Sequence, residues 1–589
     1  MNSLSTAGSP AQFETDLLLV FPPFYRLTTS MENVGIEYIA AYARAKGFRT
    51  NLINAGLHGF DTKDVLDFLS RSRFRVLGLS TIHWNLPSAL TIARSIRVSH
   101  PHCHIILGGV EAALNAEAIL TDNPYVDSIC MGEGEITMSA LLAVLTNGGD
   151  RRQVRGLAYR DGERVRFTEP EPLMEQLDSL PFPARDDMAA VLELGGPVSI
   201  SSSRGCFGRC SFCSVRSFYD LSPGPSWRGR SPASVVEEIR EIHLKSGATL
   251  FSFIDETVMG PGDKGRERVK ELARLIKRSG LNIDFFMTFR ADQVERSLFG
   301  ELKQAGLRKV ELGIESIVPE QLRRYGKSTR ADDNRNALEI LEELGIAAEI
   351  FMIPFDSYLT AEEFRQNLSF YRSRFEGSRG YDVAPLSLGN YLYPYPGTEA
   401  RRIYERNGWV PPDGGSAGFR SSDENIQRVA EAVIEFTSRI EPAFPMSYAG
   451  LGNLWINSLP LPEPVYLRVC EICGELGILL VNFSEWSLSV VSESHRCSAA
   501  DVERIVIRLL GFARELETLR RNSLELTGNW ERNRLEQPLC AMENQCAEEL
   551  HCDGNRKREL NRLSGRNEVA DEDEIVMTLL NILVKEPWR

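Results

Sequence analysis

The feature that most constrains the fold of this chain is an alternation of short apolar runs with amphipathic stretches. The run DLLLVFP at residues 16–22 is typical of a buried strand, and residues 31–46 have the spacing of a helix that ends at Gly47. Strands that alternate with helices form a parallel, doubly wound sheet, which binds ligands at the carboxyl ends of its strands. We therefore expect an α/β domain over residues 16–145, with further strands at FRTNLIN, RVLGLST, HIILGGV and DSICMG.

A second series of the same kind begins at PVSISSS, residues 197–203. A helix is expected over 232–245, because Ser231 and Pro232 are favourable residues at a helix start. Six strand–helix units are too few for an eight-stranded barrel, so the series predicts a partial (β/α)6 TIM barrel over residues 191–400. Its later strands are expected at TLFSFID (249–255), IDFFMTF (283–289), KVELGIE (309–315), AEIFMIP (348–354) and PLSLGNYL (385–392).

The other segments complete a domain division for 589 residues, which are too many for one hydrophobic core. Residues 1–15 form an N-terminal tail, and residues 146–190 form a connector with an expected hairpin at GLAYRDGERVRFTE. Residues 401–589 are charged and helical in pattern without strand alternation, which predicts a mostly helical C-terminal domain.

Composition narrows the class of partner and the compartment. The net charge is −14, from 67 basic and 81 acidic residues, so electrostatics give no reason to expect a nucleic-acid partner. No run approaches the roughly 18–20 apolar residues that span a bilayer, and residues 1–15 lack the features of an export signal. We expect no membrane partner and a cytoplasmic location, where the eleven cysteines more often bind metal or react than form disulfides.

Three of these cysteines, Cys206, Cys210 and Cys213, follow the first strand of the second series directly, in RGCFGRCSFC. A structural zinc site needs four closing ligands, and no second CxxC or HxxxH pair lies nearby. A reducing compartment argues against a disulfide. Three thiolates leave one coordination position open, which suits an iron–sulfur cluster that binds a further molecule at one iron.

The spacing CxxxCxΦC and its place after the first barrel strand resemble the signature of radical S-adenosylmethionine (SAM) enzymes. The resemblance implies a [4Fe–4S] cluster on the three cysteines, SAM on the remaining iron and Phe212 near the adenine. The fifth strand, FMIPFD, departs from the family's common glycine-bearing form. At the ends of other strands, in FIDET, TFRAD and LGIES, the resemblance implies that SAM is faced by Asp255, Glu256, Arg290, Glu315 and Ser316.

The first domain resembles the flavodoxin-like cobalamin-binding domain that precedes the barrel in one branch of these enzymes. The resemblance rests on Ser80, Thr81 and Ile82 after the third strand, on Gly108 and Gly109 after the fourth strand, and on the segment MGEGE at 131–135. His83 and Trp84, which follow the serine loop, are implied to lie under the corrin face, and YPYPGTEA at 393–400 resembles the PGT segment that closes the barrel in this branch. The other implied cofactor-binding residues of these loops are Ser80, Thr81, Gly108, Gly109, Gly132 and Glu133.

The loop after the second strand departs from the cobalamin-binding pattern DxHxxG. Asn54 stands at the Asp position, Gly56 stands at the position of the cobalt-ligating His, and Gly59 matches the closing Gly. No histidine in the usual place ligates cobalt, and His58 lies two positions away. The resemblance still implies cobalamin on Asn54 and Gly59, because members of this branch commonly bind it without a histidine.

The remaining cysteines carry no cluster signature. Cys470 and Cys473 lie in an expected amphipathic helix and are interpreted as ordinary thiols. The spacing of Cys540, Cys546 and Cys552, with His551 beside the last, fits no compact cluster.

The resemblance favours a methyltransferase that moves a methyl group from SAM through methylcobalamin to an unactivated or aromatic carbon, as in tryptophan-methylating members, in natural-product biosynthesis. The same architecture also supports a non-methylating rearrangement, cyclisation or oxidation. A third reading, a cobalamin or iron–sulfur sensor, predicts a signalling or DNA-binding module, and residues 401–589 show no basic recognition helix. The expected partners are a small-molecule or peptide substrate and a low-potential electron donor such as flavodoxin or ferredoxin.

Overall fold

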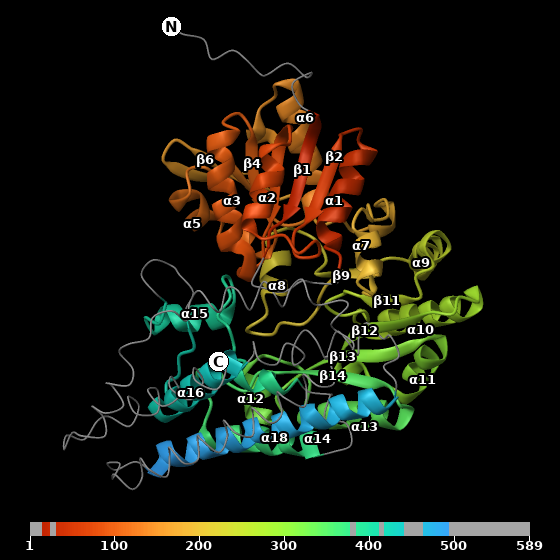
Figure 1. Ribbon diagram of the computed structural model, residues 1–589, viewed down its shortest axis with the longest axis vertical. Coiled ribbons are helices and arrows are strands. Elements are labelled where there is room, and N and C mark those ends of the chain that lie inside the picture. The colour runs from red at the N-terminus through yellow and green to blue at the C-terminus, as the bar shows by residue number, and fades with distance from the viewer. Residues whose placement is uncertain (1–13, 24–30, 377–383, 411–417, 441–462, 494–589) are drawn as a thin grey trace, which may run out of the picture. The chain divides into compact units, whose positions relative to one another are not determined.

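The computed structural model describes residues 14–23, 31–376, 384–410, 418–440 and 463–493. Figure 1 shows them as a ribbon, and they belong to two compact units. The first unit contains the chain up to Gly313 together with residues 322–348 and 393–417. The second contains residues 314–321, 349–392 and the chain from Gly418 onward.

A seven-stranded sheet forms the N-terminal part of the first unit, in the order β2-β1-β3-β4-β5-β6-β7. The first five strands are parallel, which confirms the doubly wound sheet, and the expected hairpin at 156–169 pairs antiparallel with β5 and extends it. The strand order reverses between β1 and β3, where such sheets bind ligands. The strands are β1 (Thr15–Phe21), β2 (Thr50–Asn54), β3 (Phe74–Ser80), β4 (His104–Gly108), β5 (Ser128–Cys130), β6 (Leu157–Asp161) and β7 (Arg164–Phe167).

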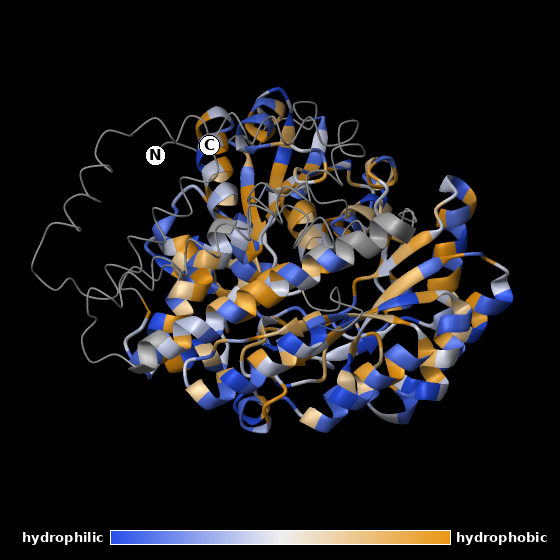
Figure 2. Cartoon of the chain, turned by 60° about the horizontal axis from the view of Figure 1, so that its bottom comes forward, coloured by the Kyte–Doolittle hydropathy of each residue, from blue (hydrophilic) through white to orange (hydrophobic). Residues whose placement is uncertain are grey.

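Helices cover both faces of this sheet, because successive strand residues point to opposite sides. Leu18 and Val20 of β1 join one buried cluster, and Leu17 and Leu19 join the other. The helices turn their apolar residues toward these clusters and carry polar residues elsewhere (Figure 2). They are α1 (Val34–Ala45), α2 (Thr62–Ser70), α3 (Leu86–Ser99), α4 (Val110–Leu114), α5 (Ala116–Asp122) and α6 (Gly134–Asn147).

A five-stranded sheet, in the order β14-β13-β12-β11-β8, follows in the chain. Its described pairings are parallel, and a short antiparallel strand pair, β9 (Ser203–Gly205) with β10 (Trp227–Gly229), leads into the cysteine loop. Helix α9 (Pro232–Ser246) begins where the sequence predicts, because Ser231 Oγ accepts a hydrogen bond from Ser234 N at 3.2 Å. The strands are β8 (Val198–Ile200), β11 (Leu250–Phe253), β12 (Asp284–Arg290), β13 (Leu307–Glu315) and β14 (Ala347–Met352).

The remaining helices of this region alternate with these strands, as the sequence predicts. They are α7 (Met188–Glu193), α8 (Ser214–Tyr219), α10 (Gly262–Ser279), α11 (Arg296–Ala305), α12 (Pro319–Arg324) and α13 (Ala331–Leu344).

The sixth strand expected at 385–392 is wrong for the described residues. Residues Pro385–Gly389 form a 3-10 helix, η6, and only Tyr391 makes an isolated bridge, to Phe355. Pro385 has no N–H for a ladder, and the N–H groups of Ser387 and Asn390 donate to carbonyls three residues back. The second sheet therefore has five strands rather than six, while the α/β class and its parallel arrangement are confirmed.

Helices dominate the described part of the chain after residue 392, as expected. In the second unit, α18 (Glu463–Glu493) packs against α14 (Ala361–Glu376) and α16 (Glu424–Ile440), and α15 (Glu399–Arg406) belongs to the first unit. Cys540, Cys546, His551 and Cys552 lie outside the described residues. Within the described ranges, no helix combines the length and the apolar character needed to cross a membrane.

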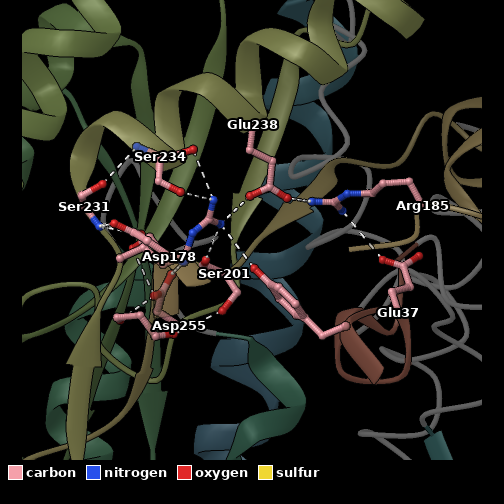
Figure 3. A network of polar contacts seen from close by, with 12 residues as sticks. Glu37, Asp178, Arg185, Ser201, Ser231, Ser234, Glu238 and Asp255 are labelled. Atoms are coloured by element: carbon pink, nitrogen blue, oxygen red, sulfur yellow. Dashed lines mark hydrogen bonds and ion pairs between the residues drawn. The ribbon is translucent and has the colours of Figure 1, made fainter. Parts of the chain in front are cut away.

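A buried polar network joins α1 to α9 within the first unit. Figure 3 shows Arg185 between Glu238 of α9 and Glu37 of α1. Arg185 Nη2 lies 2.6 Å from Glu238 Oε1, and Arg185 Nη1 lies 2.8 Å from Glu32 Oε2 and 3.9 Å from Glu37 Oε2. Arg230 also pairs with Glu238. Three carboxyl groups thus face two guanidinium groups in the interior.

Candidate functional site

A cavity of about 290 Å³ lies at the carboxyl ends of β1, β3, β4 and β5. Residues that follow β8 and β11 line it as well, so groups from both sheets of the first unit face one space. Of the residues predicted from sequence to bind cofactors, those that line it are Ser80, Gly108, Gly109, Gly132, Glu133 and Glu256.

Two glycines in the cavity wall hold conformations that side chains resist. Gly109 has φ +90°, and a Cβ there would lie 2.3 Å from Thr81 O. Gly132 has φ +89°, and its Cβ would lie 2.6 Å from Ser222 Oγ. These positions let the backbone form the cavity wall itself, which suits the close approach of a large ligand.

Thr81 shapes this wall but does not line the cavity. Its Oγ1 donates to Gly108 O at 2.8 Å and accepts from Ala112 N at 3.0 Å, while its N donates to Gly108 O at 2.7 Å. These bonds hold the loop after β3 against the loop after β4.

The loop after β2 does not line the cavity. Asn54 is buried; its Nδ2 donates to Met31 O at 3.1 Å and its Oδ1 accepts from Leu57 N at 3.4 Å. His58 Nε2 lies 2.9 Å from Asp187 Oδ1, so the imidazole ring has a hydrogen-bond partner in that carboxyl group. Gly59 completes the turn with φ +66°.

His83 and Trp84 also lie outside the cavity lining. The ring of His83 packs against Tyr393 with centroids 4.4 Å apart, and its Nδ1 lies 3.7 Å from Glu111 Oε1. The segment YPYPGTEA therefore meets the loop after β3 within the first unit. Trp84 is 54% exposed.

The cysteine loop places sulfur atoms around Gly208. A Cβ on Gly208 would lie 3.4 Å from Cys206 Sγ and 3.9 Å from Cys210 Sγ, and Gly208 N donates to Cys206 Sγ at 3.3 Å. Burial, with the neighbouring Cys210 and Cys206, raises the pKa of Cys213 to about 12. Burial therefore disfavours the thiolate form of Cys213 in the absence of a bound cation.

The loop does not have the arrangement of a mononuclear zinc site. Within the described ranges, no three His, Cys, Asp or Glu side chains are close enough to hold one ion. The donor set, three thiols with space between them, fits a multi-iron cluster better.

Arg290 and Phe212 lie beside this loop. Arg290 Nη1 would be 3.3 Å from a Cβ on Gly208, and its guanidinium is held by Asp292 at 2.9 and 3.0 Å and by Ser328 Oγ at 2.6 Å. Phe212 packs edge-to-face on Tyr325 with centroids 5.6 Å apart. Arg290 thus brings a positive charge to the cysteine loop.

Asp255 and Glu256 are adjacent, but only Glu256 lines the cavity. Glu256 Oε2 accepts from Gly205 N at 3.0 Å, and burial raises its pKa. Asp255 is buried, and its carboxylate oxygens accept hydrogen bonds from Ser202 N at 3.2 Å and from Ser203 Oγ at 2.5 Å. Asp255 therefore holds the turn between β8 and β9.

Glu315 and Ser316 belong to the second unit. Glu315 has φ +64°, a conformation that is uncommon and costly outside glycine. Ser316 is buried, and its Oγ lies 2.5 Å from Gln321 Oε1 and 3.1 Å from Asn367 Oδ1. These bonds explain the burial of Ser316.

Sequence reasoning missed several cavity residues. Arg204 precedes Cys206 by two positions, and Glu135 belongs to the same GEGE segment as Glu133. Both line the cavity, as do Tyr38 and Ile254, which is 39% exposed. The sequence could have indicated Arg204, because it is a charged residue beside the cysteine signature. Tyr38 lies on an apolar helix face, which gives no sign of a binding role.

Comparison with known protein families accounts for this arrangement. The B12 binding domain model matches residues 26–142, and the radical SAM superfamily model matches residues 200–370. The chain contains a B12-binding domain and a radical SAM domain. The B12-binding domain carries the glycine loops of the cavity, and the radical SAM domain carries the cysteine loop and Glu256.

Similar proteins span more than one activity. An uncharacterized methyltransferase of Pyrococcus horikoshii, PH0819, is 26% identical over 66% of this chain and 82% of its own length. An anaerobic magnesium-protoporphyrin IX monomethyl ester cyclase of Synechocystis is 29% identical over 44% of this chain and 51% of its own. The cobalamin-dependent SAM radical enzyme OxsB has the same fold, with a TM-score of 0.65 and 17% identity over 97% of this chain and 84% of that one.

These domains take a [4Fe–4S] cluster, SAM and cobalamin, and the residues present fit them. The thiols of Cys206 and Cys210 lie beside Gly208 and Arg290, and Cys213 neighbours both of these cysteines, so the three thiols would provide the cluster ligands. The glycine-walled space at the strand ends of the B12-binding domain suits the corrin and its tail.

Proposed function

We propose that this cobalamin-dependent radical SAM enzyme is a methyltransferase that moves a methyl group from SAM to a carbon atom of a small-molecule or peptide substrate. The observation that carries the proposal is that both domains line the same cavity. Its walls come from loops of the B12-binding domain and from Ser201, Arg204, Ile254 and Glu256 of the radical SAM domain. A group that passes between ligands of the two domains therefore need not cross solvent.

The residues around the cavity have distinct roles in this proposal. When bound, cobalamin supplies methyl-transfer chemistry, and the cluster with SAM supplies one-electron chemistry. Ser80 and the backbone at Gly108 and Gly109 hold the corrin side, and Glu256 accepts N–H groups on the SAM side. Tyr38, Phe218 and Ile254 provide apolar surface along the space between them. A low-potential electron donor is the proposed protein partner.

The relatives support methyl transfer but also favour a second candidate. The methyltransferase PH0819 shares more of its length with this chain than the magnesium-protoporphyrin cyclase does. The cyclase is nevertheless 29% identical over 44% of this chain, so a cyclisation or rearrangement is the alternative function.

The products of SAM distinguish the two functions. Anaerobically reconstituted enzyme with cobalamin, SAM, a low-potential reductant and candidate substrates is expected to release S-adenosylhomocysteine and a methylated product, measured by mass spectrometry. Release of 5′-deoxyadenosine with no S-adenosylhomocysteine would favour the alternative.

The cysteine assignment has its own test. Cys206→Ala, Cys210→Ala and Cys213→Ala are each expected to lose the brown absorption of the cluster and most of the bound iron, because a cluster site needs all three thiolates. Cys103→Ala is the matched control, since Cys103 is buried in the B12-binding domain away from the loop. Iron retention by any of the three loop variants would contradict the assignment.

A further inference from the structure

The strand pair that leads into the cysteine loop contains an unusual juxtaposition. Arg204 of β9 lies directly opposite Arg228 of β10. Like charges at opposed positions of an antiparallel pair destabilise it. Arg228 is only 4% exposed, so water cannot screen the repulsion. Some other group must compensate these charges.

Glu133 of the B12-binding domain is that group. Its Oε1 lies 3.1 Å from Arg204 Nη1, and its Oε2 lies 2.8 Å from Arg228 Nη1. Although burial alone would raise the pKa of Glu133, the two guanidinium groups outweigh it and hold the pKa below its usual value. One carboxylate thus bridges the two strands.

The two arginines depend on Glu133 unequally. Arg204 has a second acid, because its Nη2 lies 2.6 Å from Glu135 Oε1. Arg228 has no second acid: its Nη1 also donates to Met174 O at 3.1 Å, and its Nε and Nη2 have no hydrogen-bond partner among the described residues. Loss of Glu133 would leave Arg228 as a buried cation without a counter-ion.

We propose that Glu133 is a positioning residue for the cluster cysteines. It acts through β9 and β10: by neutralising Arg204 and Arg228 it keeps β9 in place, and β9 ends one residue before Cys206. A residue of the B12-binding domain thereby stabilises the metal site of the radical SAM domain. The role assigned to Glu133 differs from the direct cofactor contact predicted from sequence.

The bridge also joins the two cofactor regions. Glu133 stands between Gly132 and Gly134, and all three line the cavity. A ligand seated on this loop would therefore lie beside the residues that hold the strand pair.

Charge variants test this role in the full chain by iron and sulfide content and cluster absorption after anaerobic reconstitution. Glu133→Gln is expected to lose most of the iron and sulfide that the parent protein retains, because Arg228 is left as a buried cation without a counter-ion. Arg228→Gln is expected to retain the cluster, because Glu133 keeps Arg204 and the new amide can donate to Met174 O. The double variant Glu133→Gln/Arg228→Gln is expected to recover most of the retention.

Recovery of cluster retention in the double variant distinguishes a loss of charge compensation from a general loss of folding. Glu169→Gln is the matched control, because its partner Arg155 and its own side chain are exposed and it should retain the cluster fully. If Glu133→Gln fails to fold and the double variant folds with its cluster, the proposal stands. A folded Glu133→Gln with full cluster content, or a double variant no better than Glu133→Gln, overturns it. Because no methyl transfer is measured, the result is independent of the proposed function.

Discussion

Gly109 shows how one backbone position shapes the cavity. An alanine there would adopt φ +90° and place its Cβ 2.3 Å from Thr81 O, so two loops must move apart. We expect Gly109→Ala to lower the free energy of unfolding by about 2–4 kcal/mol, combining backbone strain with overpacking, and to weaken cobalamin binding in spectral titrations. Gly148→Ala is the control, because φ is +71° there but nothing lies within 4 Å of the added Cβ. Equal losses in both variants with unchanged cobalamin binding would contradict this view.

Asp255 ties together two elements, the end of β11 and the turn between β8 and β9. Burial raises its pKa, while hydrogen bonds from Ser203 and Ser202 and the positive charge of Arg268 act in the opposite direction. We expect Asp255→Asn to lower the free energy of unfolding by about 1–3 kcal/mol in urea, because an amide N–H₂ would face the donors of Ser202 and Ser203. Asp263→Asn, on the exposed first turn of α10, should change it by no more than about 0.5 kcal/mol. If both variants change the free energy of unfolding by a similar amount, the hydrogen bonds of Asp255 contribute little to stability.

Across the first unit, the carboxyl groups around Arg185 predict sensitivity to alkali. Burial, with Glu32 nearby, raises the pKa of Glu37 to about 9, against 4.5 when exposed. Between these values the unfolded chain has released the proton that the folded chain keeps, so stability falls as pH rises through this window. Glu37→Gln cannot ionise and is expected to flatten the fall in thermal unfolding temperature between pH 6 and about 9.

The other ionisable groups around Glu37 are Glu32, Glu238, Arg185, Asp186 and Asp187, and they remain in this variant. A fall in unfolding temperature as steep as that of the parent protein would show that another group carries the pH dependence.

Local patterns predicted much of the fold because side-chain period and capping are properties of a few consecutive residues. The apolar run DLLLVFP predicted β1, and Ser231 with Pro232 predicted the start of α9. The same locality explains the error at 385–392, where an apolar run resembles a strand but Pro385 and local hydrogen bonds produce η6.

The sequence by itself determined the two parallel sheets, the spacing of Cys206, Cys210 and Cys213 and the glycine loops, since each is encoded within a short segment. Only the tertiary structure decided that those loops share a cavity with Glu256, that Asp255 faces inward and that Glu133 bridges Arg204 and Arg228. Glu133 lies 71 and 95 residues from its two partners in the chain. Ion pairs at such separations depend on which surfaces the folded sheets bring together. A local sequence pattern does not specify those surfaces.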